Sequence, residues 1–246
     1  MKNLQRRTAV VTGGSRGIGA AIARRLALQG ANVVITYHNS EAKAFAVVRQ
    51  IEEAGGKGLA VAADSADPKA VRGAIGEAVR VFGGLDILVN NAGIGLFNDI
   101  TAFTDDDFDR IMAVNVRAVF AGSQAALPYL GTGGRIITIG SCLAERVARP
   151  GASLYAMSKS ALIGLTKGMA RDLGPRGITV NLVHPGPVDT DMNPADGPFS
   201  KDQLSRMAIP AYGKAEDIAG LVAWLAGPEG GYVTGAGFAA DGGTNI

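Results

Sequence analysis

The stretch TAVVTGGSRGIG, residues 8–19, joins a short β-branched run to a glycine-rich turn and the start of an expected helix. Residues 8–12 are almost continuously apolar, as in a strand that is buried on both faces of a parallel sheet. Gly13 allows a tight turn, Gly17 lets the backbone approach a pyrophosphate, and Gly19 permits close packing of the helix. The spacing is Thr-Gly-x-x-x-Gly-x-Gly rather than Gly-x-Gly-x-x-Gly. Its place between strand and helix nevertheless predicts a dinucleotide site, with the phosphates at the helix N-terminus.

The rest of the chain repeats this strand and helix pattern. Further apolar runs that we interpret as buried strands lie at 32–37, 58–62, 86–90, 135–140 and 179–184. Their alternation with helical patterns predicts right-handed crossovers. We expect a single-domain α/β Rossmann fold over residues 1–246, with a doubly wound parallel sheet of about seven strands and helices on both faces. The stretch 237–246 is expected to add one strand and a tail.

Helix boundaries are marked by capping residues. Ser40, Asp67 and Thr104 each precede a helical pattern and are good N-cap residues, and Pro68 suits a first helical position. Glycine favours the position just after a helix. The glycines that we expect at helix ends are Gly30, Gly55, Gly83 and Gly174.

The composition excludes several classes of protein. The chain has 246 residues, of which 47% are hydrophobic and 19% are charged, enough for a sizeable core. The single cysteine, Cys142, rules out an internal disulfide and a cysteine-based metal cluster, and two histidines rule out a multi-histidine site. A net charge of +2 without a basic stretch gives no support for nucleic-acid binding. Without an apolar run that could span a bilayer and without a signal peptide, we expect a cytoplasmic protein that binds neither metal nor membrane.

The end of the second strand bears on the choice of dinucleotide. An acid at this point accepts hydrogen bonds from the adenosine ribose of NAD, but TYHNS, residues 36–40, contains none. Arg16 in the glycine loop supplies a cation near the same ribose. The sequence therefore predicts NADP(H) in preference to NAD(H).

A tyrosine and a lysine, Tyr155 and Lys159, stand four residues apart in SLYAMSKSAL, residues 153–162. On a helix such a pair shares one face. The pair is open to two interpretations, a phenol tuned for proton transfer by an ammonium or ordinary groups on a helix surface. The pair alone does not decide between them.

Further motifs resemble, in order, those of the short-chain dehydrogenase/reductase family over nearly the whole chain. They are TGGSRGIG (12–19), Asp64 in AADS, NNAG (90–93), Asn115 in AVNVRA, Ser141 in IGSC, the Tyr155 and Lys159 pair, and HPGPVDTDM (184–192). The resemblance is to the 3-oxoacyl-carrier-protein reductase-like and carbonyl reductase branch. Two positions depart from common patterns. His184 stands where a small or apolar residue is frequent, and Gly140 stands where a second serine is often found.

The resemblance implies the site residues. The catalytic set is Asn115, Ser141, Tyr155 and Lys159. The cofactor-binding set is Gly13, Ser15, Arg16, Gly17, Ile18, Gly19, Tyr37, His38, Asn39, Ser40, Asp64, Ser65, Asn91, Ala92, Gly93, Tyr155, Lys159, Pro185, Gly186, Val188 and Thr190. Cys142 has no evident base and is interpreted as pocket lining or core, and His184 as a hydrogen-bonded residue at a strand end.

The resemblance implies NADPH-dependent reduction of a ketone, aldehyde or β-ketoacyl compound, with Tyr155 as the acid/base. The sequence leaves an alternative open, because NPADGP and AWLAGPE are similar to a cyclic di-GMP-binding regulator of the same fold. We expect the substrate wall at 95–98, 142–153 and a mobile lid over about 187–210. The apolar residues of the substrate wall are expected to be Leu96, Phe97, Leu143, Leu154 and Met192. The partner is expected to be a small molecule, and the chain a homotetramer or homodimer through two long helices near 107–130 and 153–173.

Overall fold

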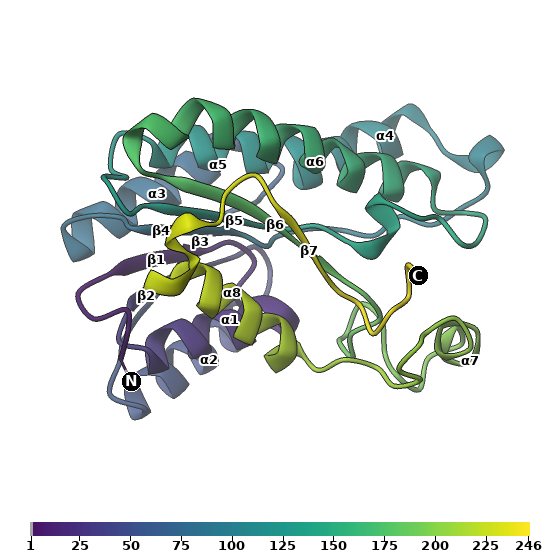
Figure 1. Cartoon of the computed structure of the whole chain (residues 1–246), viewed down its shortest axis with the longest axis horizontal. Coiled ribbons are helices and arrows are strands. Elements are labelled where there is room, and N and C mark those ends of the chain that lie inside the picture. The colour runs from purple at the N-terminus through teal and green to yellow at the C-terminus, as the bar shows by residue number, and fades with distance from the viewer. Residues whose placement is uncertain (1) are drawn as a thin grey trace.

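The computed structural model describes residues 2–246 and contains one seven-stranded parallel sheet in the order β3-β2-β1-β4-β5-β6-β7 (Figure 1). The strands are β1 (Thr8–Val11), β2 (Asn32–Tyr37), β3 (Lys57–Ala62), β4 (Ile87–Asn90), β5 (Arg135–Ile139), β6 (Thr179–Pro185) and β7 (Gly237–Ala240). The doubly wound fold predicted from the sequence is confirmed. β1 pairs with both β2 and β4, so the strand order reverses between β1 and β4. Ligands bind such sheets at the carboxyl ends of the strands beside this reversal.

Two layers of helices cover the sheet. In Figure 1, α3, α4, α5 and α6 lie above it, and α1, α2 and α8 lie below it. The helices are α1 (Gly17–Leu28), α2 (Glu41–Glu53), α3 (Pro68–Phe82), α4 (Asp105–Met112), α5 (Ala118–Ala126), α6 (Ser153–Leu173), α7 (Ser200–Leu204) and α8 (Ala215–Ala226). One hydrophobic core lies between α1, α2, α8 and the sheet, and a second lies under α3, α5 and α6. Because both faces are buried, the central strands need no alternation of polar and apolar residues.

The helix starts follow the predicted caps in two cases of three. Asp67 accepts a hydrogen bond from the Lys69 N–H, and Pro68 occupies the first turn of α3. Thr104 and Asp107 form a reciprocal capping box at the start of α4. The prediction for Ser40 was only partly right, because Ser40 precedes α2 but its side chain makes no capping bond.

The helix ends hold one correction. Gly30, Gly55 and Gly83 all follow helices with positive φ, as expected. Gly174 has φ −51 and continues into a 3-10 turn over Gly174–Arg176. Gly177, with φ +69, is the left-handed residue that stops this helix. The 3-10 turn begins at Gly174, has Pro175 in its first positions, and moves the end of the helical segment from residue 174 to residue 177.

Two other sequence predictions need correction. The helix expected over 107–130 is divided into α4, a π-helical segment (Ala113–Arg117) and α5. The run at 58–62 is a strand but is not buried, because β3 is at the sheet edge and its residues are half-buried or exposed. The strand expected after residue 237 is confirmed as β7, the opposite edge.

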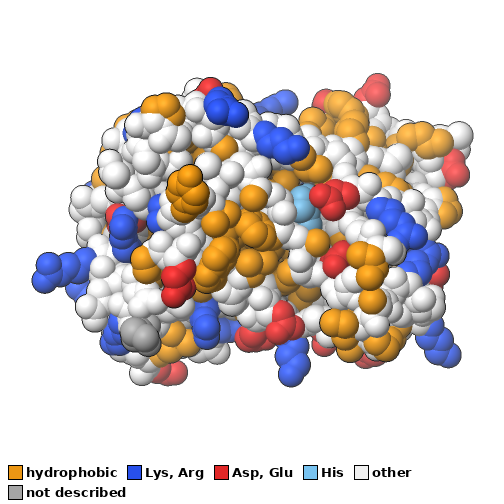
Figure 2. All heavy atoms as spheres, in the orientation of Figure 1, with side chains coloured by type: hydrophobic (Ala, Val, Ile, Leu, Met, Phe, Trp, Pro, Cys, Tyr) orange, Lys and Arg blue, Asp and Glu red, His pale blue; other side chains and the backbone are white. Residues whose placement is uncertain are grey.

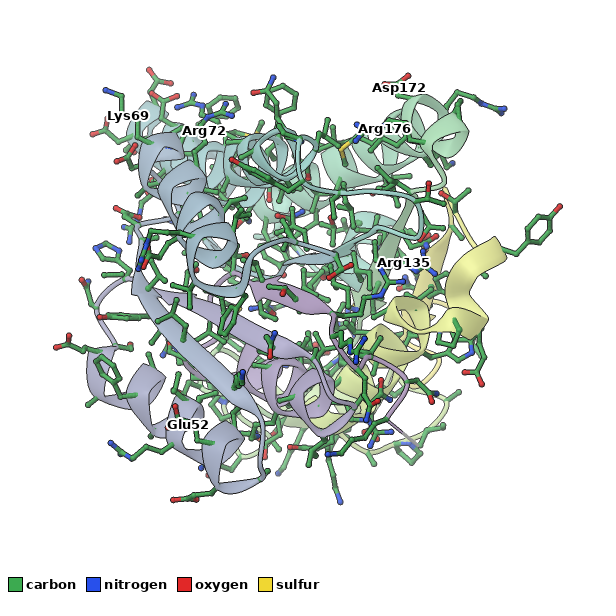
Figure 3. All side chains as sticks on the ribbon, turned by 90° about the vertical axis from the view of Figure 1, so that its left-hand side faces the viewer. Glu52, Lys69, Arg72, Arg135, Asp172 and Arg176 are labelled. Carbon is green, nitrogen blue, oxygen red and sulfur yellow. The ribbon has the colours of Figure 1, made fainter. Side chains whose placement is uncertain are left out.

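A buried arginine lies at the amino end of β5. Arg135 at the start of β5 lies beside the end of α8, and its guanidinium donates to the carbonyl oxygens of Gly133, Gly134 and Gly227 (Figure 3). These bonds tie the start of β5 to the end of α8. No helix in the described part of the chain combines the length and apolar character of a membrane span.

Candidate active site

A cavity of about 660 Å³ lies at the carboxyl ends of the strands. All the residues predicted to bind the cofactor line it, as do Ser141, Tyr155 and Lys159. These residues come from seven separate stretches of chain between Gly13 and Thr190. The fold therefore brings nearly the whole predicted site into one space.

The glycine loop is held by the end of β4. The Asn91 side-chain amide donates to the carbonyl oxygens of Thr12 and Gly13, at 2.8 and 3.1 Å. A Cβ on Gly19 would lie 2.4 Å from the Asn91 amide nitrogen, so only glycine fits there. Gly13 and Gly17 have φ of +64 and +53, in the left-handed region that favours glycine.

The start of α1 suits a phosphate group. Its N-cap residue, Arg16, makes no side-chain capping bond to the helix, so the first N–H groups of α1 are free to bind an anion. These donors face the same cavity as the loop glycines. The loop therefore fits the pyrophosphate of a dinucleotide.

Three charged groups meet beside the loop. Asp191, from the segment after β6, lies 3.2 Å from an Arg16 guanidinium nitrogen and 3.0 Å from the Lys43 ammonium. Lys43 first, and Arg16 second, hold the pKa of Asp191 below its ordinary value. The two cations converge on one carboxylate oxygen, in an arrangement that also suits a phosphate. His38 lies 3.5 Å from Asp64, two positions that were expected to contact the adenosine.

Tyr155, in the first turn of α6, lines the cavity together with Ser141. Burial raises the pKa of the phenol, and a hydrogen bond with the Ser141 side chain opposes that rise. The sequence left open a phenol tuned by the Lys159 ammonium, and the group that opposes the rise of this pKa is the Ser141 hydroxyl. Both residues line the same cavity, and hydroxyl groups placed together in this way are suited to proton transfer to a carbonyl oxygen.

Lys159 is only 4% exposed and donates to the carbonyl oxygen of Ile139 at 2.9 Å. Its ammonium lies 5.9 Å from the centre of the Tyr155 ring. Burial lowers the pKa of Lys159 to about 8. The lysine is thus held on the last residue of β5, one turn of helix from the tyrosine.

Asn115 does not line the cavity, unlike the other residues of the predicted catalytic set. It lies in the π-helical segment and is 1% exposed. Its amide accepts from the Ile94 N–H at 2.9 Å and donates to the Ile94 carbonyl and the Ser158 hydroxyl. The π-helical turn aims this amide at the chain after β4, a frequent use of such turns near functional sites.

The substrate wall is built around an arginine between two aromatic rings. The Arg149 guanidinium lies 5.2 Å from the centre of Phe97 and 4.6 Å from that of Phe199. Phe97 also packs on Tyr155, with ring centres 5.2 Å apart. Phe97, Leu143 and Met192 line the cavity as expected, but Leu96 and Leu154 do not. Leu154 faces inward from α6 and is buried in the protein.

Cys142 is buried, and burial raises the pKa of its thiol to about 11. A thiol with this pKa is a weak nucleophile at neutral pH. This agrees with the interpretation of Cys142 as core or pocket lining. Within residues 2–246, no group of three or more histidine, cysteine, aspartate and glutamate side chains is placed to hold a metal ion.

Sequence reasoning missed three residues of the site, Lys43, Asp191 and Phe199. Lys43 follows the second strand by only six residues, and that proximity was the available signal. Asp191 and Phe199 belong to the segment expected to form a lid. Asp191 lies 175 residues from Arg16 and 148 residues from Lys43 along the chain, and Phe199 lies 50 residues from Arg149. No local sequence pattern could therefore pair them.

Comparison with known proteins places this geometry in a family. Residues 13–245 match the family described as Enoyl-(Acyl carrier protein) reductase. A short-chain dehydrogenase from Burkholderia cenocepacia, solved in complex with NADP, is 60% identical; the match covers 99% of this chain and 100% of that one, with a TM-score of 0.98. A cyclic-di-GMP-binding biofilm dispersal mediator protein from Escherichia coli is 49% identical over 236 residues, 96% of each chain.

The third comparison is with a 3-oxoacyl-[acyl-carrier-protein] reductase from Staphylococcus aureus. It is 41% identical over 232 residues, which are 93% of this chain and 94% of the relative. These matches run through the glycine loop and the Tyr155 and Lys159 pair to the last strand. The chain therefore belongs to the short-chain dehydrogenase/reductase family of oxidoreductases.

Proposed function

We propose that this protein reduces a ketone or aldehyde to an alcohol with NADPH. The observation that carries the proposal is the meeting of Ser141, Tyr155 and Lys159 with the glycine loop in one cavity. A protein that only binds nucleotides does not need a buried phenol beside a serine hydroxyl and a buried lysine.

Bound NADPH supplies the hydride. The Tyr155 hydroxyl donates its proton to the carbonyl oxygen, and the Ser141 hydroxyl donates a hydrogen bond that fixes the same oxygen. Lys159, held by the Ile139 carbonyl, would bind the nicotinamide ribose, and its ammonium, 5.9 Å from the Tyr155 ring centre, would stabilise the phenolate that remains. Asn115 orients the chain after β4 through its bonds to Ile94. The family resemblance implies that Asn115 would also hold a water that links Lys159 to solvent.

The preference for NADPH rests on Arg16 and Lys43. Both cations already bind one oxygen of Asp191, and a ribose 2′-phosphate offers the same chemistry with more charge. The relative from Burkholderia cenocepacia was solved with NADP, which supports the proposal. The end of β2 has no acidic residue that could accept hydrogen bonds from the free adenosine ribose hydroxyls of NADH.

The direct test is turnover of a panel of ketones, aldehydes and β-keto esters, followed as NADPH consumption. We expect alcohol formation with at least one member of the panel, and a lower kcat/KM with NADH. Tyr155→Phe is the matched control, because it removes one oxygen atom and keeps the ring on Phe97. Turnover that survives this substitution would sink the proposed mechanism.

A second candidate function is binding of cyclic di-GMP, and one observation favours it. The Escherichia coli relative at 49% identity is named for that activity. Calorimetric titration with cyclic di-GMP, alone and with saturating NADPH, separates the two functions. A tight cyclic di-GMP complex together with no turnover of any carbonyl would replace the first proposal with the second.

We also infer that the chain forms one domain and assembles as a homotetramer or homodimer in the cytoplasm. Figure 2 shows hydrophobic side chains gathered over β7 and α8 at the middle of one face. Trp224 of α8 is 38% exposed and packs edge-on against Phe238 of β7, with ring centres 6.2 Å apart. β7 is also an edge strand with unpaired backbone groups, which favours a second chain there. The segment 187–210 is proposed to be the mobile lid over the substrate.

A further inference from the structure

His184 lies at the carboxyl end of β6, between β5 and β7 (Figure 1), and its side chain is 1% exposed. Its Nδ1 lies 2.8 Å from the carbonyl oxygen of Ser141, and its Nε2 is buried with no hydrogen-bond partner among the described residues. An unpartnered buried nitrogen costs stability. A histidine at this place therefore calls for a reason beyond filling the core.

The contact with Ser141 assigns the tautomer of the ring. A carbonyl oxygen only accepts hydrogen bonds, so Nδ1 must carry the proton to bind at 2.8 Å. The Ser141 N–H lies 3.4 Å from the same nitrogen and cannot donate to an atom that already bears a hydrogen. The shorter contact therefore assigns the proton to Nδ1, and Nε2 carries a lone pair and no proton.

The ring also explains the residue before the serine. A Cβ on Gly140 would lie 2.8 Å from Nδ1 and 3.1 Å from Cε1 of His184. The imidazole thus occupies the space that a side chain at position 140 would need. The two departures from common family patterns, at 140 and 184, are in contact and complement each other.

We propose that His184 is a positioning residue for Ser141. It holds the serine's carbonyl oxygen at the point where the chain leaves β5. The backbone of Ser141 then directs the hydroxyl toward Tyr155, and Leu143 N–H donates to that hydroxyl at 3.2 Å. Gly140 leaves room for the ring that performs this task. The catalytic consequence rests on the proposed reductase function, whereas the tautomer and the packing do not.

The first test does not depend on turnover. The chain contains two histidines, so a ¹⁵N-labelled sample shows two imidazole spin systems in a long-range ¹H–¹⁵N spectrum. The His38→Gln variant removes one of them and assigns the other. We expect His184 to carry its proton on Nδ1 near neutral pH. A proton on Nε2 alone would overturn the proposal.

The second test separates a hydrogen bond from simple core packing. Asn presents an amide N–H near the place of Nδ1, and Gln presents one near the place of Nε2. We expect His184→Asn to retain kcat within about twofold, and His184→Gln and His184→Leu to lose between about tenfold and a hundredfold in kcat. KM and the Kd for NADPH should stay within about twofold in all three. Equal kcat for Leu and wild type would overturn the proposal, as would equal losses for Asn, Gln and Leu.

The third test substitutes Gly140, the other member of the contact with His184. It also covers the case in which the His184→Leu variant fails to fold. Gly140→Ala should lower kcat in the wild-type chain, because the new methyl displaces the ring. In the His184→Ala background the same substitution should cost less, since the ring is gone and only the Leu182 Cδ1 methyl remains, 3.2 Å from the added Cβ. Equal effects in the two backgrounds would contradict the contact. If the wild type turns over no carbonyl compound, the proposed function fails while the spectrum still decides the tautomer.

Discussion

At the scale of single residues, Tyr155 and its neighbours form a site in which burial works against the charged forms. Burial raises the pKa of the tyrosine and lowers that of Lys159 to about 8. Groups whose pKa values are moved in this way are candidates for proton transfer. The bonds from Ser141 and to Ile139 decide where these groups can lie.

Replacement of Tyr155 by phenylalanine should reduce kcat by about 10²–10⁴-fold, because the general acid is lost. The Kd for NADPH should change little, since the ring and its contact with Phe97 remain. Stopped-flow turnover and fluorescence titration of NADPH measure the two quantities. A variant with wild-type kcat on the best substrate is the contrary outcome.

The cofactor preference should depend on both cations near Asp191. Charge-assisted bonds contribute roughly 1.5–3 kcal/mol, so Arg16→Ala or Lys43→Ala should remove about one to two decades of NADPH preference. Asp191→Asn should strengthen NADPH binding, because the carboxylate no longer competes for the cations. The measurement is kcat/KM with NADPH and with NADH for each variant. The kcat/KM for NADH should hardly change.

The exposed Lys69 of α3 offers a control for these charge changes (Figure 3). Lys69→Ala removes one positive charge at a position outside the cavity and should leave the cofactor preference unchanged. Equal losses for NADPH and NADH in Arg16→Ala would mean that Arg16 only supports the loop.

The stability of the protein should depend on pH through Lys159. Its pKa falls from 10.5 in the unfolded chain to about 8 in the folded protein, so below pH 8 the folded state bears the cost of a buried charge. Between these values the unfolded state binds more protons, and the free energy of unfolding rises with pH. The shift corresponds to about 3 kcal/mol at most.

Lys159→Met isolates this effect. The difference in unfolding free energy, wild type minus variant, should increase as the pH is raised through 8 toward 10. Urea unfolding without cofactor at a series of pH values measures it. A difference that is independent of pH would show that the lysine keeps its ordinary pKa in the folded state.

At the scale of elements, the segment after β6 contacts both the cofactor end and the substrate end of the site. Asp191 binds Arg16 and Lys43 near the cofactor end, and Phe199 packs on Arg149 near the substrate end. The segment also contains α7 and pairs at Val188 with Gly213. The Arg206 guanidinium also donates to the Ala148 carbonyl oxygen, and the Ile209 N–H donates to the Gly242 carbonyl oxygen. Under the proposed function, opening of the lid has to break contacts of this kind.

Arg149→Ala should loosen this segment. One cation–π contact, with Phe199, joins the Arg149 guanidinium to the segment, so its loss at about 0.5–1 kcal/mol should increase the open population by roughly two- to fivefold. Limited proteolysis within 187–210 should accelerate to match. Arg146→Ala provides the control, because Arg146 binds the carbonyl oxygens of Thr244 and Ile246 instead. Equal cleavage rates for wild type and Arg149→Ala would contradict the lid.

At the scale of the whole molecule, the apolar area over β7 and α8 bears on assembly (Figure 2). A large contiguous patch of exposed apolar side chains commonly marks a site of interaction with another molecule. Two copies related by a twofold axis could each present the same strand and helix to the other.

Multi-angle light scattering at micromolar concentration should report a dimer or a tetramer. Trp224→Glu should shift the protein toward smaller species, because it places a charge beside Phe238 in the apolar patch. Glu229→Gln, in the exposed turn after α8, is a matched control for a surface substitution nearby. A wild-type monomer would refute the assembly, and an unchanged mass in Trp224→Glu would place the interface elsewhere.

The sequence by itself determined the strands, most helix boundaries and the doubly wound class of the sheet. Apolar runs, capping residues such as Asp67 and Thr104, and glycines such as Gly83 act through local backbone preferences, which neighbouring residues encode. The glycine loop and the Tyr155 and Lys159 pair could be recognised for the same reason, because each motif is short and continuous.

Only the tertiary structure decided which side chains meet across the carboxyl ends of the strands. Asp191 joins Arg16 and Lys43, and His184 holds Ser141 from 43 residues away. The π-helical turn that directs Asn115 at Ile94 also depends on packing between α4, α5 and the sheet. Local patterns do not contain these pairings, because their energies arise only once parallel strands have brought distant residues to one edge.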